Sequence, residues 1–339
     1  MKLYLYMPNI PTCTMSETTV PTMYRVSTIT CNGDIIKNIK RDVPPPIPSG
    51  KPRGRRGGVA RQAPIVPVVK PEFKKKDTLI HLQVFFDNVR LVDSKTDDVG
   101  FIWAENGPNR NRGDNLKKPK RNAEDRKIFD NQVTVVYRFE TGYKPNIKLF
   151  RNGNIHVTGI RKPEDGEFIV KLMSDEVLRI ANDGFEILNK DHVSDTSLIG
   201  PSNFKIRMIN SDFSVPFRVR RKDLHKLLIS NVYDNICSFQ PGTYPGVKLQ
   251  FYWNTQYDNN EGKCLCRCEE RDHCDGKGDG SQMGCCKKIT ISTFESGKVL
   301  ITGATSFVQV NKAYAYICKV IMSNQDILKK VVDPPSCAS

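Results

Sequence analysis

Residues 147 to 159 read IKLFRNGNIHVTG, and residues 291 to 303 read ISTFESGKVLITG. Five of these thirteen positions are identical without a gap, whereas unrelated segments would share about one. The identical pairs are Ile147 with Ile291, Phe150 with Phe294, Gly153 with Gly297, Thr158 with Thr302, and Gly159 with Gly303. The sequence therefore predicts a duplicated structural unit.

Each copy has the pattern of a β-hairpin. Asn152-Gly153 in the first copy and Ser296-Gly297 in the second are suited to a tight turn between twisted strands. Successive strand residues point to opposite faces, so the alternation separates two sets of side chains. One face carries mostly aliphatic residues in both copies. The other face carries Lys148, Phe150, His156 and Thr158 in the first copy, and Ser292, Phe294, Leu300 and Thr302 in the second.

An amphipathic helix is predicted after each hairpin, because apolar residues recur there at steps of three and four. The predicted apolar stripes comprise Ile169, Met173, Val177 and Ile180 in the first copy, and Phe307, Val310, Tyr314, Ile317 and Ile321 in the second. Thr305 or Ser306 can cap the second helix. The aliphatic hairpin faces are the available partners for these stripes, so the face that carries Phe150 and Phe294 should remain uncovered.

The same order of elements is predicted upstream of each hairpin. Strands are expected at 24–30 and 133–139 in the first copy and at 204–210 and 247–253 in the second, with a helix at 221–233. Residues 78–89 fit a helix or a strand equally well. The expected organisation is an N-terminal segment 1–22, a first repeat 23–182 with basic insertions at about 43–76 and 92–127, a linker 183–203, a second repeat 204–322 with a cysteine-rich insertion at about 254–287, and a tail 323–339.

Charge is concentrated in two segments of the chain. The 339 residues contain 52 Lys and Arg against 37 Asp and Glu, a net charge of +15. Residues 40–76 hold eleven basic and two acidic groups, and residues 109–127 hold eight basic and three acidic groups. Both segments are interpreted as flexible basic loops that contact a phosphate backbone, with a solubilising spacer as the alternative. The sequence lacks an apolar run that could span a membrane and a signal-peptide core.

The cysteine-rich insertion predicts a metal site. Its candidate ligands are Cys264, Cys266, Cys268, His273, Cys274, Cys285 and Cys286. Its glycines leave no hydrophobic core, so a tetrahedral Zn²⁺ would be an effective way to order it. The spacing does not select four ligands from these seven, and a two-metal cluster, disulfides or a free-thiol loop are the alternatives. The other cysteines are expected to be small apolar packing residues.

Catalytic motifs are missing from the sequence. It contains no phosphate-binding loop, no nucleophile elbow and no HExxH, and its five histidines have no paired spacing. We therefore expect a protein that is not an enzyme.

The two copies resemble the TATA-box-binding protein family, and the second is the better match. Its matching motifs are Phe204-Lys205-Ile206, Val215-Pro216-Phe217, Tyr244-Pro245-Gly246-Val247, Phe294-Glu295-Ser296-Gly297-Lys298 and Leu300-Ile301-Thr302-Gly303-Ala304. The resemblance covers about 23–182 and 204–322 once insertions are removed. The insertions are foreign to cellular members and similar to those of divergent versions encoded by large DNA viruses.

This resemblance implies an α+β fold shaped like a saddle. Two pseudo-symmetric halves share one curved antiparallel sheet, helices cover the convex face, and the concave face binds the DNA minor groove. Paired aromatic side chains wedge between base steps in that family. Phe150 and Phe294 match one wedge of each pair, Tyr244 occupies the second copy's other wedge position, and Phe129 lies one residue out of register with its equivalent. Thr158 and Thr302 match threonines that touch base edges.

Lys148, His156 and Ser292 depart from the family pattern, which has apolar residues at these positions on the groove floor. Lys148 and His156 could favour phosphate or sugar contacts, and this would loosen sequence selectivity. The resemblance implies double-stranded DNA, general initiation factors and RNA polymerase as partners of a monomer, in the nucleus or, for a viral protein, in a cytoplasmic factory or virion.

Three functions are consistent with these observations. The first is a transcription initiation factor that binds and bends the minor groove by phenylalanine insertion. The second is a structural or packaging protein that binds nucleic acid nonspecifically through the same fold and its basic loops. The third is a protein-interaction platform with a zinc module, which would not bend DNA.

Overall fold

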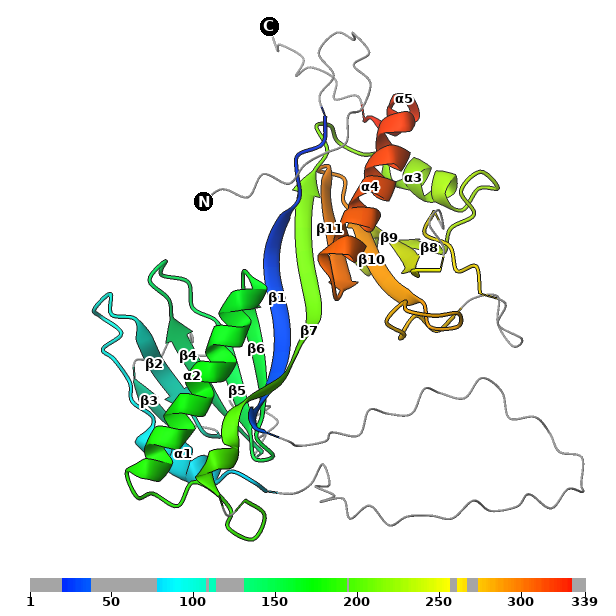
Figure 1. Cartoon of the computed structure of the whole chain (residues 1–339). Coiled ribbons are helices and arrows are strands. Elements are labelled where there is room, and N and C mark those ends of the chain that lie inside the picture. The colour runs from blue at the N-terminus through cyan, green and yellow to red at the C-terminus, as the bar shows by residue number, and fades with distance from the viewer. Residues whose placement is uncertain are drawn as a thin grey trace, which may run out of the picture.

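The computed structural model describes residues 20–37, 78–107, 110–113, 131–193, 195–256, 261–266 and 274–330. Within them the strands form one antiparallel sheet of eleven strands in the order β3-β2-β4-β5-β6-β1-β7-β11-β10-β9-β8. Figure 1 shows β1 and β7 side by side in the middle of this curved sheet, with one half of the molecule on each side. The predicted α+β saddle is confirmed.

The first repeat contains β1 (Arg25–Ile36), α1 (Leu82–Asn88), β2 (Gly100–Glu105), β3 (Asn111–Gly113), β4 (Gln132–Arg138), β5 (Asn146–Phe150), β6 (Asn154–Ile160) and α2 (Pro163–Asn182). A 3₁₀ turn, η1 (Thr196–Leu198), precedes the second repeat. The second repeat contains β7 (Ile199–Ser214), α3 (Arg221–Leu228), β8 (Cys237–Gln240), β9 (Tyr244–Trp253), β10 (Lys287–Thr293), β11 (Lys298–Ala304) and α4 (Phe307–Ser323), followed by α5 (Gln325–Leu328).

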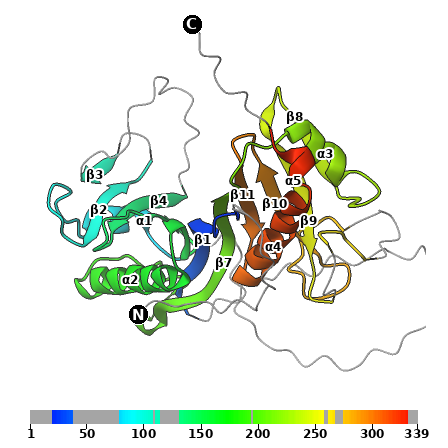
Figure 2. The ribbon, with the colours of Figure 1, turned by 90° about the horizontal axis from the view of Figure 1, so that it is seen from above.

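The duplication is visible in the order of elements. Each repeat runs strand, helix, four strands and long helix, and β3 is an additional strand at the edge of the first repeat. The opening strands of the two repeats pair with each other, for example Ile29 with Ile209, and this pairing makes the sheet continuous. Seen from above, the two halves lie on either side of β1 and β7 (Figure 2).

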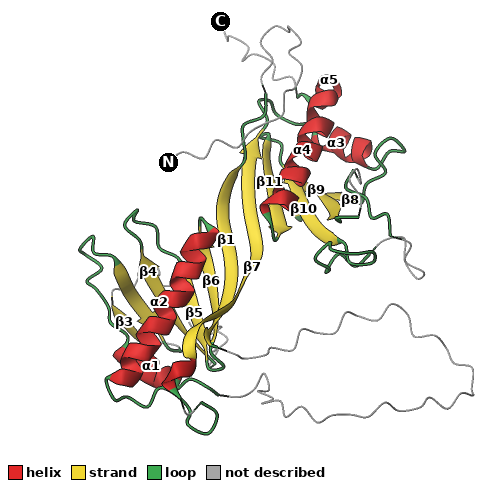
Figure 3. Ribbon diagram, viewed as in Figure 1, coloured by secondary structure: helices red, strands yellow, loops and turns green. Residues whose placement is uncertain are grey.

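The helices lie on one face of the sheet, as expected from the apolar stripes (Figure 3). The predicted residues of α2 are buried, and Val310, Ile317 and Ile321 of α4 are fully buried against the aliphatic hairpin faces. Phe307 was expected in the same stripe but is 37% exposed, because it occupies the first position of the helix. Ser306 caps α4 by accepting a hydrogen bond from the Gln309 backbone N–H.

The expected boundaries differ from the observed elements in several places. Segment 92–127 was expected to be an insertion, but it contains β2, whose residues 101–104 are buried and pair with β4. Strand β2 is the counterpart of β8, so this part of the segment belongs to the sheet. The expected linker 183–203 contains the start of β7, because Ile199 pairs with Ile36. The basic segment 40–76 and residues 114–127 lie outside the described residues.

Helix boundaries show the same effect of tertiary contacts. The expected tail contains α5, because Leu328 is fully buried and packs in the core. The helix expected at 221–233 ends at Leu228. Residues 78–89, which fitted either element, contain the helix α1.

The hairpin-turn glycines predict a measurable difference between the two repeats. Gly297 has a φ of +86°, and a Cβ there would lie 2.5 Å from the Phe217 carbonyl oxygen. At Gly153, with a φ of +74°, the nearest atom would be the movable Ile36 side chain at 3.3 Å. We expect Gly297→Ala to lower the free energy of unfolding by about 2–4 kcal/mol and Gly153→Ala to cost less.

Urea unfolding of these variants beside Gly242→Ala checks this expectation, since a Cβ at Gly242 would meet no atom within 4 Å. Equal effects at Gly297 and Gly242 would contradict it.

Candidate nucleic-acid interface

The sheet face opposite the helices is the concave face, and it is formed by the hairpin side chains that alternate with the buried aliphatic ones. Ile147, Leu149, Ile155 and Val157 are fully buried on the helix side. Between them, Lys148, Phe150, His156 and Thr158 are only partly buried on the concave side. The face predicted from alternation is therefore the one that the helices leave open.

An aromatic pair lies on the concave face of the second repeat. The Tyr244 and Phe294 rings have centroids 5.8 Å apart and are tilted by 58°. Both are partly buried, yet neither packs against the hydrophobic core that the helices share with the sheet. The Lys248 ammonium lies 3.8 Å from the centre of the Tyr244 ring, a cation–π contact. This geometry brings together the two residues that were predicted to be the wedge pair of the second repeat.

The turn that carries Phe294 is fixed by charged contacts. Glu295 accepts hydrogen bonds from Arg218 at 2.6 Å, Lys330 at 2.9 Å and Arg221 at 3.0 Å. The bond and charge of Lys330, with those of Arg218, lower the pKa of Glu295. These contacts tie the turn to α3 and to the segment after α5, so Phe294 is presented by a held turn.

Phe150 occupies the corresponding position in the first repeat. It pairs across the ladder with Gln132 and, like Phe294, lies outside the core packing. Its backbone turn is held differently, because the Arg151 carbonyl accepts hydrogen bonds from the N–H groups of Leu79 and Ile80. Phe129, its expected partner, lies outside the described residues.

A polar row crosses the concave face of the first repeat. Lys148 on β5 lies opposite His156 on β6, His156 opposite Asn32 on β1, and Asn32 opposite Lys205 on β7. His156 Nδ1 is 2.8 Å from Asn32 Oδ1. Burial, Lys148 and Arg207 each lower the pKa of His156. The row gives this half of the face a cationic floor.

Sequence reasoning missed four of these residues: Asn32, Lys205, Arg207 and Lys248. The alternation in β7 contained the signal, because Lys205 and Arg207 are exposed while Phe204 and Ile206 pack against the core. The face to which that strand turns its charges became clear only from its pairing with β1.

The predicted threonines occupy equivalent places on the same face. Thr158 pairs with Thr30 on β1 and Asn146 on β5. Thr302 lies opposite Thr290, and its hydroxyl is 3.5 Å from the Thr290 carbonyl oxygen. Both threonines are partly buried, so each presents a hydroxyl and a methyl group beside the polar or aromatic residues.

Four thiols of the cysteine-rich insertion meet beside β9. The sulfur atoms of Cys264, Cys266, Cys274 and Cys286 all lie within 4.8 Å of one another, so this cluster could hold a metal ion. Cys286 Sγ is 3.4 Å from Cys266 Sγ and 3.7 Å from Cys264 Sγ. Ligands 2.3 Å from a tetrahedral Zn²⁺ would be about 3.8 Å apart, so the spacing fits one ion.

Backbone groups also point at these sulfur atoms. Cys264 Sγ accepts from the Cys274 N–H at 3.2 Å, and Cys266 Sγ accepts from the Gly284 N–H at 3.1 Å. Such N–H donors would stabilise thiolates. Burial, together with the neighbouring thiols, raises the pKa of Cys286 to about 12.

The other predicted ligands are not in this cluster. The Cys285 thiol accepts a hydrogen bond from Gln282 instead, while Cys268 and His273 lie outside the described residues. Cys264, Cys285 and Cys286 are free thiols. Cys31, expected to be a packing residue, is fully buried in the core.

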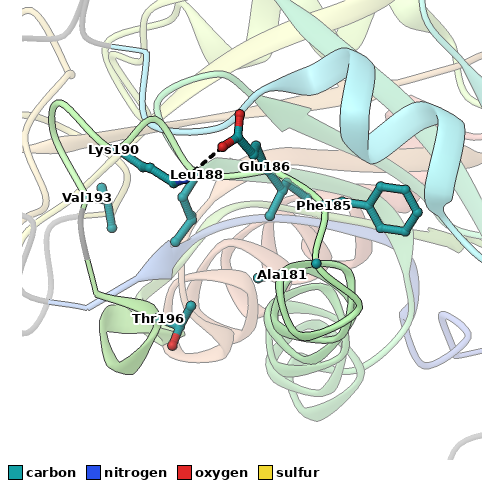
Figure 4. Close-up of a pocket in the computed structure, with 9 residues that line it drawn as sticks. Ala181, Phe185, Glu186, Leu188, Lys190, Val193 and Thr196 are labelled. Atoms are coloured by element: carbon teal, nitrogen blue, oxygen red, sulfur yellow. Dashed lines mark hydrogen bonds and ion pairs between the residues drawn. The ribbon is translucent and has the colours of Figure 1, made fainter.

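A shallow pocket follows α2 on the first repeat (Figure 4). It is lined by Ala181, Gly184, Phe185, Glu186, Ile187, Leu188, Lys190, Val193 and Thr196. Its charged groups form an ion pair, Glu186 with Lys190 at 2.7 Å, and no predicted site residue lines it.

No helix in the described part of the chain is long and apolar enough to cross a membrane.

A viral protein and a solved archaeal structure are similar to this chain. No protein-family model matches the chain. A protein of Acanthamoeba polyphaga mimivirus named TATA-box-binding protein-like is 30% identical over 264 residues, which cover 73% of this chain and 62% of that protein. Among solved structures, Methanococcus jannaschii TBP matches 89% of this chain and 99% of its own, with 14% identity and a TM-score of 0.41. The chain spans less than two thirds of the length of its mimivirus relative, and the expected resemblance to a divergent, virus-encoded TATA-box-binding protein-like protein is confirmed.

Proposed function

We propose that this protein binds double-stranded DNA through its concave face and bends it by inserting aromatic side chains into the minor groove. The observation that supports this most directly is the Tyr244 and Phe294 pair, which lies on the open face outside the core, with Phe294 on a held turn. Apolar wedges of this kind unstack base steps and kink the duplex. A role in transcription initiation, without enzymatic activity, accords with the family.

A bending assay tests this proposal. Fluorescent dyes at the two ends of an A·T-rich duplex should approach each other when the protein binds, and a G·C-rich control should respond less. Salt-sensitive binding to both duplexes without a change in dye distance would exclude the wedge. That outcome would instead support the nonspecific structural role, which the polar row on the concave face and the basic segments of the sequence also favour.

The charges of β7 give a separate prediction about salt dependence. Lys205 and Arg207 are exposed on the concave face, so each should release counterions when it meets a phosphate. We expect Lys205→Gln and Arg207→Gln each to reduce the slope of log affinity against log salt by about one unit. Lys171→Gln on α2 should leave the slope unchanged, because Lys171 is exposed on the helix-covered side. If the salt slope is the same for all three variants, the DNA does not contact Lys205 and Arg207.

The cysteine cluster supports a zinc site as the second part of the proposal. Thiolate ligands favour Zn²⁺ over hard cations, and four of them make a closed structural site. Cys264, Cys266, Cys274 and Cys286 would hold the ion and order the loop between β9 and β10.

The protein partners and the location follow only from the family. General initiation factors and RNA polymerase would join a DNA-bound saddle, in the nucleus or, for a viral protein, in a cytoplasmic factory or virion. Co-purification of polymerase subunits on promoter DNA would test this.

A further inference from the structure

We infer that His156 accepts a hydrogen bond from the exocyclic amino group of guanine, so the first-repeat half of the concave face favours a G·C pair where the second-repeat half favours A·T. This inference rests on the proposed minor-groove binding. It assigns the saddle a direction on DNA that its pseudo-symmetry alone does not supply.

The hydrogen bond with Asn32 determines which nitrogen of His156 can meet DNA. An amide oxygen only accepts hydrogen bonds, so Nδ1, 2.8 Å from Asn32 Oδ1, carries the proton. In the neutral ring, Nε2 is then an acceptor. Burial together with the cations Lys148 and Arg207 disfavours the doubly protonated ring and lowers its pKa.

The neighbours of His156 make this acceptor distinctive. Its row continues into Lys148 on one side and Lys205 beyond Asn32 on the other, and Arg207 lies near on β7. Lys and Arg only donate hydrogen bonds. They suit phosphate oxygens or the base acceptors of the groove, whereas His156 Nε2 needs a donor.

The minor groove offers one base donor. A·T pairs present only the acceptors adenine N3 and thymine O2, while a G·C pair adds the guanine N2 amino group. The partly buried acceptor of His156 would therefore be satisfied by guanine and left unpaired against A·T. An unpaired polar group in a closed interface is costly, and this cost is the physical basis of the preference.

The second repeat has a different residue at this place. The hairpin repeat aligns His156 with Leu300, and Lys148 with Ser292, which is 5% exposed. Leu300 lies opposite Asp212, a buried residue whose carboxylate is held by Arg25 at 3.0 Å and by Lys298 at 3.4 Å. Leu300 supplies no acceptor, and the Asp212 carboxylate opposite it is already engaged by Arg25 and Lys298, so a guanine amino group at this half would lose its hydrogen bond with water without an equivalent replacement.

Reciprocal variants test the inference on the intact protein. Three duplexes share one length: an all-A·T site, a site with one G·C pair at the matching position in one half, and a site with G·C in both halves. Because the protein can bind a duplex in either orientation, it can place its first repeat over the half of the single-G·C site that contains guanine, and its second repeat over the A·T half. The wild type should bind it roughly five- to tenfold more tightly than the site with G·C in both halves, and at least as tightly as the all-A·T site.

His156→Leu, which copies the second repeat, should remove the advantage of the single-G·C site while all-A·T binding persists. Leu300→His should raise the affinity for the site with G·C in both halves by a similar factor. If the wild type and both variants rank the three duplexes identically, this inference is wrong, although bending of the all-A·T site would still support the proposed function. If no duplex is bent, the proposed function itself fails.

Discussion

A protein carrying Phe150→Ala and Phe294→Ala is expected to leave an A·T-rich duplex straight and to bind it roughly a hundredfold more weakly. Each phenylalanine lies on the concave face at the start of a hairpin turn, so the two variants remove one wedge from each half. With one wedge of each pair removed, the remaining side chains no longer offset the cost of unstacking, and the contacts that a bent duplex allows are lost. End-to-end energy transfer on the labelled duplex, with an affinity titration, measures both effects.

A stability measurement distinguishes a direct loss of DNA bending from misfolding of the double variant. Neither phenylalanine packs in the core, so the double variant should unfold at nearly the same denaturant concentration as the wild type. Phe185→Ala is the matched control, because Phe185 is 46% exposed after α2, away from the concave face. A double variant that still bends DNA, or a Phe185→Ala protein that does not, would contradict the wedge assignment.

The second large effect is expected from the cysteine cluster. The purified chain should contain about one zinc ion, and Cys274→Ser should reduce this content by most of its value. A four-thiolate site loses its closed tetrahedral shell when one sulfur is removed, and the described residues of the surrounding loop form only a small apolar cluster. Metal analysis after dialysis, combined with limited proteolysis between β9 and β10, measures the loss of the ion and of order.

Cys285→Ser is the control for that experiment, because its thiol lies outside the group of four and accepts only from Gln282 within the described part of the chain. Zinc lost from Cys285→Ser but retained in Cys274→Ser would overturn the ligand set. If the wild-type protein contains no zinc and its thiols react freely with a thiol reagent, the proposed metal site is wrong.

The repeat and its faces were predictable because they depend on local pattern. Turn glycines, alternating strands and helical periodicity identified both hairpins, and the strict period of two in a strand assigned Phe150, Phe294, Thr158 and Thr302 to one side. The extent of several elements was not predictable. In the sequence, β2 looks like part of a basic insertion, and only its pairing with β4 shows that it is a strand of the sheet. Likewise, α5 looks like part of a tail, and only the burial of Leu328 shows that it belongs to the fold.

The concave interface was only half predictable from the chain. Its aromatic and threonine residues stand out as repeated positions, whereas Lys205, Arg207 and Asn32 join the site through pairing of β1 with β7, strands more than 160 residues apart. The hydrogen bond that orients His156 crosses from β6 to β1 and has no local signature. The choice of four thiols from seven candidate ligands likewise depends on which sulfur atoms the folded loop brings together.

The sequence by itself determined that the chain is a duplicated α+β unit with one open face, because periodicity and turn chemistry act over a few residues. Tertiary structure alone decided which charges share that face, how the Phe294 turn is held and which thiols meet. Those contacts join residues far apart in the chain, and their geometry exists only once the strands are in register.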